Sequence, residues 1–256
     1  MKRVRVIPVL LLKKGGLVKT ERFKAAKYVG DPINAVKIFN EKEVDEIVLL
    51  DISATSERRG PDFETVKKIV SEAFMPLAYG GGITTIQQVS ELIQSGVEKI
   101  ILGTSGYTNT KLISEAAKQV GSQSVVVCLD VKKNWRGKSR VYVQNGTQNT
   151  DLDPATYAKR AEDAGAGELF LQAIEKDGSF KGYDLDLISD VSNAVNIPVV
   201  ALGGASEIDD FTQAIQKGAS AVAAGSFFVF QRPHKAVLIS YPTQKELKEK
   251  LFTRIA

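Results

Sequence analysis

One acidic residue, Asp130, interrupts an otherwise apolar run in VVVCLDVKK, residues 125–133. A similar stretch, RVIPVLLLKKGG at residues 5–16, carries Leu11 at the matching place. A carboxyl group can donate or accept a proton in catalysis, and leucine can do neither. If the two stretches are structural equivalents, the chain keeps one proton-carrying group and lacks its counterpart.

Glycine-rich patches are the second chemical feature. Their backbone N–H groups can approach an anion closely, and a helix that follows presents its positive end. One pair comprises Gly80, Gly81 and Gly82 with Gly103, Thr104 and Ser105, and the other comprises Gly203 and Gly204 with Gly225 and Ser226. A lone glycine pair favours a tight turn. Two patches in each half, in the same order and each followed by a helical pattern, favour phosphate binding.

These residues follow short apolar runs that alternate with amphipathic helical patterns. The predicted strands are residues 4–12, 47–51, 77–79, 100–102, 125–131, 169–174, 199–202 and 221–224. Helical patterns include residues 63–74, 86–94, 112–120, 187–195 and 211–217. Helix starts are predicted at Asp31–Pro32, at Asp153–Pro154 and at a Ser206–Asp209 capping box. Eight such units in about 250 residues predict an α/β fold, a single TIM (β/α)8 barrel.

An internal repeat divides the barrel. Residues 75–105 match residues 197–227 at one offset, which places Gly81 over Gly203 and Gly103 over Gly225. The sequence therefore predicts one domain, residues 1–256, built from two similar four-unit halves at about 1–120 and 121–256. The opening pair, Leu11 and Asp130, needs a three-residue loop gap to fit this repeat.

Composition narrows the possible functions. The net charge of +4 comes from 34 basic and 30 acidic residues that are interspersed, which does not suggest a nucleic-acid partner. Cys128 is the one cysteine, so the sequence favours a reducing, cytoplasmic location. No segment approaches the roughly 20 apolar residues of a membrane helix. We expect no metal, no cofactor and no membrane association.

The motifs resemble the cyclase subunit of imidazole glycerol phosphate synthase over nearly the whole chain. They are LLDISA at 49–54, YGGGI at 79–83, GSQSVVVCLDVK at 121–132, DGSFKGYD at 177–184 and LGGA at 202–205. The resemblance implies a glutaminase partner on the N-terminal barrel face, whose ammonia crosses the barrel to a bisphosphorylated substrate. Two aspartates then act as general acid and base. Asp130 matches one, and Leu11 stands at the other position, a loss typically worth about 10²- to 10⁴-fold in rate.

The resemblance also assigns the pocket. Four further positions match substrate-binding residues of the family, namely Lys19, Asp51, Asp177 and Gly178. Other positions depart from the family: Gln172, Ala173 and Glu175 replace the usual Thr, Ser and Asp, and Leu202 replaces a usual Ser. We therefore expect an altered pocket that still takes a phosphorylated small molecule.

Four charged residues fall at the starts of strands: Arg5, Glu46, Lys99 and Glu168. Two cations and two anions at the N-terminal mouth could form a ring of ion pairs, and all four match the family's gate over the ammonia passage. The alternative is ordinary surface ion pairs, which contribute only about 0–1 kcal/mol each. Four matched positions together favour the gate.

The combination resembles a paralogous branch of the family associated with surface-polysaccharide sugars. In that branch a glutaminase and this barrel deliver ammonia to a separate sugar amidotransferase, which makes an acetamidino group. RVIPVLLLKKGGLVKT and FVFQRPHKAVLISYP carry this likeness. The chain is therefore interpreted as a non-cyclising subunit of a glutamine amidotransferase complex. An active cyclase of histidine biosynthesis, a lyase, and a scaffold that passes no ammonia are the alternatives.

Three conspicuous residues have ordinary interpretations. His234 lacks a nearby partner for a metal site and is expected at the surface or in a tail contact. Trp135 lies in a long segment whose Asn145–Gly146 pair predicts a hairpin, and it could stack on a ligand or anchor the loop. Cys128 precedes Asp130 by two residues and should point into the barrel, as packing or passage lining.

Overall fold

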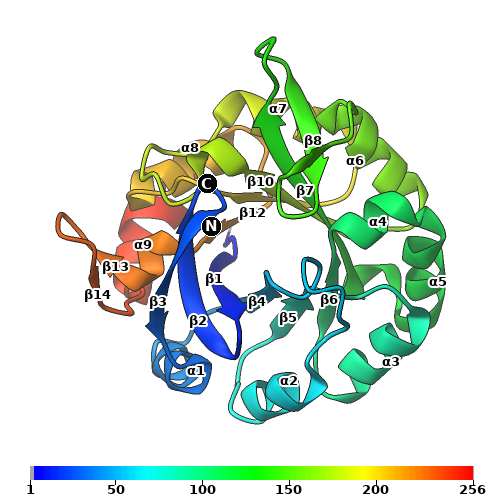
Figure 1. Cartoon of the computed structure of the whole chain (residues 1–256). Coiled ribbons are helices and arrows are strands. Elements are labelled where there is room, and N and C mark those ends of the chain that lie inside the picture. Colours follow the sequence, from blue (N-terminus) through cyan, green and yellow to red (C-terminus); the bar gives the residue numbers. More distant parts are fainter. Residues whose placement is uncertain (1–2, 256) are drawn as a thin grey trace.

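The computed structural model describes residues 3–255, so Met1, Lys2 and Ala256 of the predicted domain lie outside the described residues. Eight parallel strands close into one ring, seen along its axis in Figure 1. Around the ring they are β1 (Val6–Lys13), β4 (Ile47–Asp51), β5 (Leu77–Gly80), β6 (Lys99–Leu102), β7 (Val125–Lys133), β10 (Glu168–Ala173), β11 (Val199–Leu202) and β12 (Ala221–Ala224). The predicted TIM barrel is confirmed.

Helices pack around the outside of this ring (Figure 1). They are α1 (Pro32–Glu41), α2 (Phe63–Val70), α3 (Ile86–Gln94), α4 (Thr104–Thr108), α5 (Thr110–Val120), α6 (Pro154–Asp163), α7 (Leu185–Ala194), α8 (Ile208–Gln216), α9 (Ser226–Val229) and α10 (Gln244–Leu247), which continues into a π-helical turn, Lys248–Phe252. Three-residue 3-10 turns occur at Ser122–Ser124 and Ile174–Lys176. None of the helices in residues 3–255 combines the length and the apolar character required to cross a bilayer.

Side-chain caps fix several helix starts. Asp31 accepts a hydrogen bond from the Asn34 backbone N–H at 2.9 Å, and Asp153 accepts one from Thr156 at 3.1 Å, with proline at the first helical position in both cases. The predicted Ser206–Asp209 capping box is wrong by one residue. The carboxylate that caps α8 belongs to Asp210, which accepts from the backbone N–H groups of Ser206 and Glu207.

Two other predicted boundaries also moved. The predicted helix 63–74 ends at Val70, because Ser71 leads into a turn that leaves Phe74 in the loop before β5. The first strand begins at Val6 and continues into an antiparallel extension, β2 (Gly16–Glu21) and β3 (Lys24–Gly30), which the sequence did not predict. This extension lies at the C-terminal end of β1.

Two more antiparallel pairs extend the loops at the C-terminal face. Strand β7 turns back as β8 (Ser139–Val143), and β8 pairs with β9 (Gln148–Asn149) around the predicted Asn145–Gly146 turn. The pair β13 (Phe230–Gln231) and β14 (Ala236–Val237) follows α9. Loops at this face of a TIM barrel build the functional site.

The core has two parts, as alternation of side chains along barrel strands requires. Between the strands and the helices lies the larger cluster, which includes Phe39, Tyr79, Leu112, Tyr157 and Phe211. Inside the ring lies a smaller apolar cluster: Ile7, Val9, Val48, Ala78, Ile101, Val126, Phe170, Val200, Leu202, Ala221 and Ala223. Leu11, Leu50 and Cys128 pack against this inner cluster from the C-terminal side.

Strand register tests whether Leu11 and Asp130 occupy equivalent positions in the two halves. In the first half, Leu11 pairs with Leu50 and Leu50 with Gly80; in the second half, Asp130 pairs with Gln172 and Gln172 with Leu202. The sequence repeat places Gly80 over Leu202, so both routes make Leu11 and Asp130 equivalent. The division at about residue 120 remains a prediction.

Candidate active site

A cavity of about 660 Å³ opens at the C-terminal ends of the barrel strands. Leu11 and Asp130 both line it. They lie on β1 and β7, which are separated by three strands in either direction around the ring, so the two side chains face the cavity from opposite walls. The cavity therefore has a carboxyl group on one wall and an aliphatic side chain where its counterpart would be.

Asp130 is held in a state suited to proton transfer. Burial raises its pKa to about 7; the thiol of Cys128, which donates to its Oδ1 at 3.5 Å, opposes this rise and the nearby charge of Asp177 adds to it. Burial and the adjacent Asp130 carboxylate raise the pKa of the Cys128 thiol well above its usual value. Cys128 is therefore a neutral hydrogen-bond donor, which agrees with its predicted role in lining the barrel.

Lys19 and Asp177 connect the β2–β3 extension to the cavity. Burial lowers the pKa of Lys19 to about 8, partly opposed by Asp177, and its ammonium donates to the Val9 carbonyl. Asp177 accepts from the Thr20 hydroxyl at 2.8 Å and from the Phe23 N–H at 3.3 Å, and burial raises its pKa. These contacts fix the extension beside the cavity, which both residues line.

Asp51 lies in a network of polar contacts at the end of β4. Its Oδ1 accepts from the backbone N–H groups of Ser53 and Ala54 and from the Ser53 hydroxyl, while its Oδ2 lies 2.8 Å from the Arg59 guanidinium. Arg59 also pairs with Glu57 at 2.8 Å. Asp51 is consequently a fully engaged carboxylate rather than a free acid or base.

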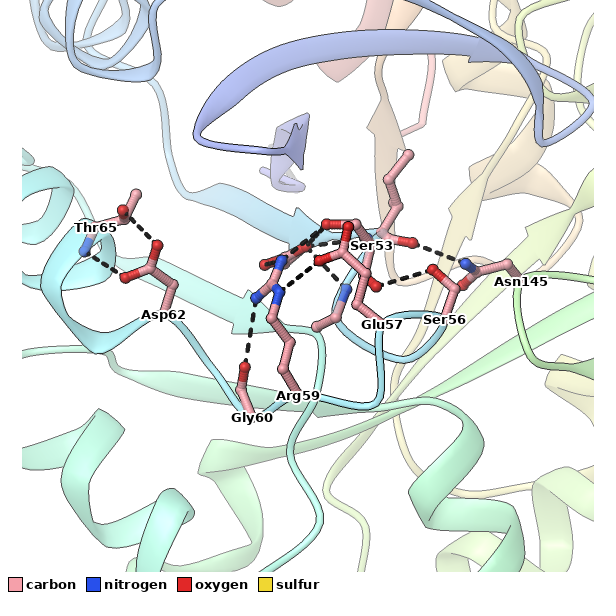
Figure 2. Close-up of polar contacts among 11 residues, drawn as sticks. Ser53, Ser56, Glu57, Arg59, Gly60, Asp62, Thr65 and Asn145 are labelled. Carbon is pink, nitrogen blue, oxygen red and sulfur yellow. Dashed lines mark hydrogen bonds and ion pairs between the residues drawn. The ribbon is translucent and has the colours of Figure 1, made fainter.

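Sequence reasoning missed Arg59 and Asn145. Both line the cavity, and the Asn145 amide donates to the Ile52 carbonyl at 2.7 Å, which ties the β8–β9 turn to the loop after β4 (Figure 2). The available signal for Arg59 was the arginine pair in SERRG (residues 56–60), in the loop after a strand that ends in Asp51. For Asn145, the Asn-Gly pair indicates a turn but not a position beside the cavity.

The first predicted phosphate cradle lines the large cavity. Gly81, Gly82, Gly103 and Thr104 all border it. Gly81 has φ +124°, and a Cβ there would lie 2.5 Å from the Asp51 carbonyl oxygen, so only glycine fits. Thr104 begins α4 and its hydroxyl accepts from the Gln144 N–H at 2.9 Å.

The second predicted cradle borders a smaller cavity of about 20 Å³. It is lined by Gly178, Gly203, Gly204, Gly225 and Ser226, and it shares Asp177, Leu202 and Gly225 with the large cavity. A Cβ on Gly204 would collide with the Gly182 carbonyl. The helices that follow Gly103 and Gly225, α4 and α9, are only five and four residues long, so an anion at these two patches would depend on backbone N–H groups more than on a helix dipole.

Gln172 and Leu202 extend the wall next to Asp130. Gln172 is 4% exposed, it lines the cavity, and its side chain has no hydrogen bond to any residue in the described range 3–255. Leu202 is 7% exposed and borders both cavities. The wall next to Asp130 therefore combines an apolar side chain, Leu202, with the Gln172 amide, which is available to a ligand.

The four charged residues at the opposite mouth form a closed ring. The Arg5 guanidinium contacts Glu46 at 2.5 Å and also contacts Glu168, and the Lys99 ammonium lies 3.0 Å from each of the same two carboxylates. Burial acts to lower the pKa of Arg5, but its hydrogen bonds and attraction to Glu168 and Glu46 raise it. Both glutamates are buried, so these are not ordinary surface pairs.

The remaining conspicuous residues lie outside the cavity. His234 is exposed in the turn between β13 and β14. Trp135 is 86% exposed at the turn between β7 and β8, so it neither anchors the loop by burial nor lines the cavity. Glu175 accepts from the Lys133 N–H at 3.2 Å at the base of that hairpin.

Comparisons with known proteins agree with this architecture. The family described as "Histidine biosynthesis protein" matches residues 5–233. The chain is 48% identical over 253 residues (98% of this chain, 97% of the relative) to "Putative imidazole glycerol phosphate synthase subunit hisF3" of Vibrio vulnificus. It is 47% identical over 248 residues (96% and 99%) to "Putative imidazole glycerol phosphate synthase subunit hisF2" of Pseudomonas aeruginosa. It is 41% identical over 225 residues (88% and 89%) to "Imidazole glycerol phosphate synthase subunit HisF" of Alkaliphilus metalliredigens. The chain therefore belongs to the histidine biosynthesis protein family and is similar to its imidazole glycerol phosphate synthase HisF subunits.

Proposed function

We propose that this barrel is the ammonia-transferring, non-cyclising subunit of a glutamine amidotransferase complex. A glutaminase would dock on the N-terminal face and release ammonia at the ring of Arg5, Glu46, Lys99 and Glu168. The ammonia would cross the barrel and serve a separate sugar amidotransferase of surface-polysaccharide synthesis. The single observation that carries this proposal is Leu11 on the wall opposite Asp130.

The reasoning rests on what ring closure requires. A step that needs a proton donor and a proton acceptor on opposite sides of a substrate loses one of them when leucine occupies the position. The other carboxylates at the mouth do not replace it. Asp51 is engaged by Arg59 and Ser53, and Asp177 is engaged by Thr20 and Phe23.

The interior of the barrel supports the transfer of a small neutral molecule. Between the charged ring and the cavity the strands contribute apolar side chains, among them Ile7, Val48, Ala78 and Ala221. Neutral ammonia needs no charged lining, whereas an ion would be excluded by such a layer. The charged ring at the entrance would then exchange its ion pairs to admit ammonia.

An active cyclase is the second candidate function. Asp130 and both glycine cradles favour it, because these are the parts of the site that a bisphosphorylated substrate would need. The cyclase should turn over that substrate with added ammonium salt in the absence of any glutaminase. The transfer subunit should not.

The test of the transfer function is a coupling measurement in the reconstituted complex of barrel, glutaminase and sugar amidotransferase. With ¹⁵N-amide glutamine, the intact barrel should place label in the amidated sugar in near one-to-one ratio with glutamate formed. Lys99→Ala or Arg5→Ala should lower this ratio several-fold, while the matched surface variant Lys111→Ala should not. An unchanged ratio in the ring variants would favour a scaffold through which no ammonia passes.

A further inference from the structure

A hydrogen-bonded hairpin projects from the end of β7. Its turn is built by Asn134, whose side-chain oxygen accepts from the backbone N–H groups of Arg136 and Lys138 at 3.0 Å each. The Gly137 N–H donates to the Asn134 carbonyl at 2.9 Å, and at the base Glu175 holds the Lys133 N–H. These hydrogen bonds give the residues at the tip of the hairpin a defined backbone conformation.

Trp135 stands at this tip, 86% exposed. The Arg136 guanidinium lies over its ring, 4.4 Å from the centroid. Folding gains nothing from an indole left in water, since the hydrophobic contribution depends on area removed from solvent. Tryptophan and arginine are the side chains most enriched at the energetic centres of protein interfaces.

The same segment is strongly basic. Residues 132–140, KKNWRGKSR, which we call the basic hairpin, hold five cations and no acid: Lys132, Lys133, Arg136, Lys138 and Arg140. The net charge of the whole chain is +4, so these nine residues hold more than the entire positive excess. Within residues 3–255, none of the five is part of an ion pair. Intramolecular pairing therefore does not account for them.

The hairpin lies at the face where the cavity opens. Asp130 lines the cavity, and β7 continues for three more residues, about 10 Å, before the turn that carries Trp135. In Figure 1 the β7–β8 hairpin reaches past the outline of the barrel. Residues 132–140 border none of the three cavities described in residues 3–255, although Asp130 and Asn145 on either side do. The tip of the hairpin therefore lies beside the mouth of the large cavity without lining it.

We propose that the basic hairpin docks a protein with an acidic surface and an apolar recess that receives the Trp135 indole. On the proposed function, on which this inference rests, that protein is the sugar amidotransferase that takes up the ammonia. Ammonia leaving an open cavity would be lost to solvent, so the acceptor must sit across this face. Five unpaired cations would steer an acidic partner, and the indole would fix its position.

Site-specific cross-linking tests the surface without assuming the partner. A photoreactive phenylalanine derivative replaces Trp135 in the full-length chain, which is expressed in cells of the source organism. After irradiation, the cross-linked partner is identified by mass spectrometry. The matched control places the same group at Phe74, 88% exposed in the loop before β5 at the opposite face. Position 135 should cross-link to a sugar amidotransferase and position 74 should not. Cross-links from position 135 only to glutaminase, nucleic acid or lipid, or none at all, would overturn the proposal.

Charge reversal in the purified complex provides the second measurement. Arg136→Glu with Lys138→Glu, and separately Trp135→Ser, should weaken binding of the barrel to the amidotransferase at least tenfold. The charge-reversal variant should also lose most of the salt dependence of that binding. Lys111→Glu with Lys118→Glu on α5 is the matched control and should change the affinity less than twofold. Equal effects of both charge pairs would contradict a specific surface.

The two proposals fail in different ways. If the intact complex transfers no labelled nitrogen from glutamine to a sugar, the proposed function is wrong whatever the hairpin binds. If transfer is intact and remains so in the Arg136→Glu, Lys138→Glu and Trp135→Ser variants, with unchanged affinity, the docking surface alone is wrong. Glutaminase activity in these variants should stay at the level of the intact complex, because the hairpin lies on the other face.

Discussion

Leu11 and Asp130 occupy equivalent positions on opposite strands, β1 and β7, and face one cavity from its two walls. The equivalence follows from strand register as well as from the repeat, since Leu11–Leu50–Gly80 and Asp130–Gln172–Leu202 run in parallel around the two halves. One half of the barrel therefore has a carboxyl group at the position where the other half has leucine.

Asp130 should make the stability of the fold depend on pH. Its pKa is about 7 in the folded chain, against 3.8 for an ordinary aspartate, so the folded state binds more protons between these values. Stability is thus lost as pH rises through this window. The free energy of unfolding of Asp130→Asn should exceed that of the parent by about 2–4 kcal/mol at pH 8, where the buried Asp130 carboxylate is charged. At pH 4 the two free energies of unfolding should be nearly equal. Urea titrations at both pH values measure this, and a constant difference would contradict the assigned pKa.

Removal of one cation from the ring should destabilise the barrel. Lys99→Met leaves the buried carboxylates of Glu46 and Glu168 with Arg5 alone, which should lower the free energy of unfolding by about 1–3 kcal/mol. Lys99→Arg keeps the charge and should cost less than half as much. Guanidinium-induced unfolding is unsuitable because it screens the ring, so urea is the denaturant. A Met variant as stable as the parent would show that the ring contributes nothing to folding.

Gly81 should tolerate no side chain. Gly81→Ala brings a Cβ to 2.5 Å from the Asp51 carbonyl at φ +124°, which should cost about 2–4 kcal/mol. Gly15→Ala is the matched control, because φ is +77° there but no atom lies within 4 Å of the added Cβ. Backbone strain alone should lower its free energy of unfolding by about 1 kcal/mol. Thermal and urea unfolding of the two variants compare them. Equal costs would mean that close packing at the first cradle is not what requires glycine.

The sequence predicted the barrel because strand and helix periodicities, repeated eight times, agree with one another. Local pattern alone placed Asp130 and the glycines near the C-terminal ends of strands, whereas Lys19, which lies within β2, was assigned only by the family resemblance. It missed the β2–β3 extension, whose strand β3 is largely exposed and carries no apolar alternation. It missed Arg59 as well, because its role depends on the fold bringing it within 2.8 Å of Asp51.

The boundaries that moved have structural causes. Helix α2 ends four residues before Phe74 because Asn40, from α1, binds the Phe74 N–H and the Glu72 carbonyl and draws that segment into a loop. The cap of α8 moved from Asp209 to Asp210 because the helix has Glu207, not Ser206, as its N-cap, which makes Asp210 the third helical residue. The end of α2 thus depends on a contact from a distant part of the chain, which no local pattern carries.

The most direct measurement is steady-state turnover of the cyclase substrate by the purified barrel with saturating ammonium salt. The 41% identical Alkaliphilus metalliredigens subunit serves as the positive control. Leucine at position 11 predicts a rate at least 10²-fold below that control, with partial recovery in Leu11→Asp. A parent rate within tenfold of the control would contradict the account, because it would show that ring closure proceeds without a carboxylate on β1.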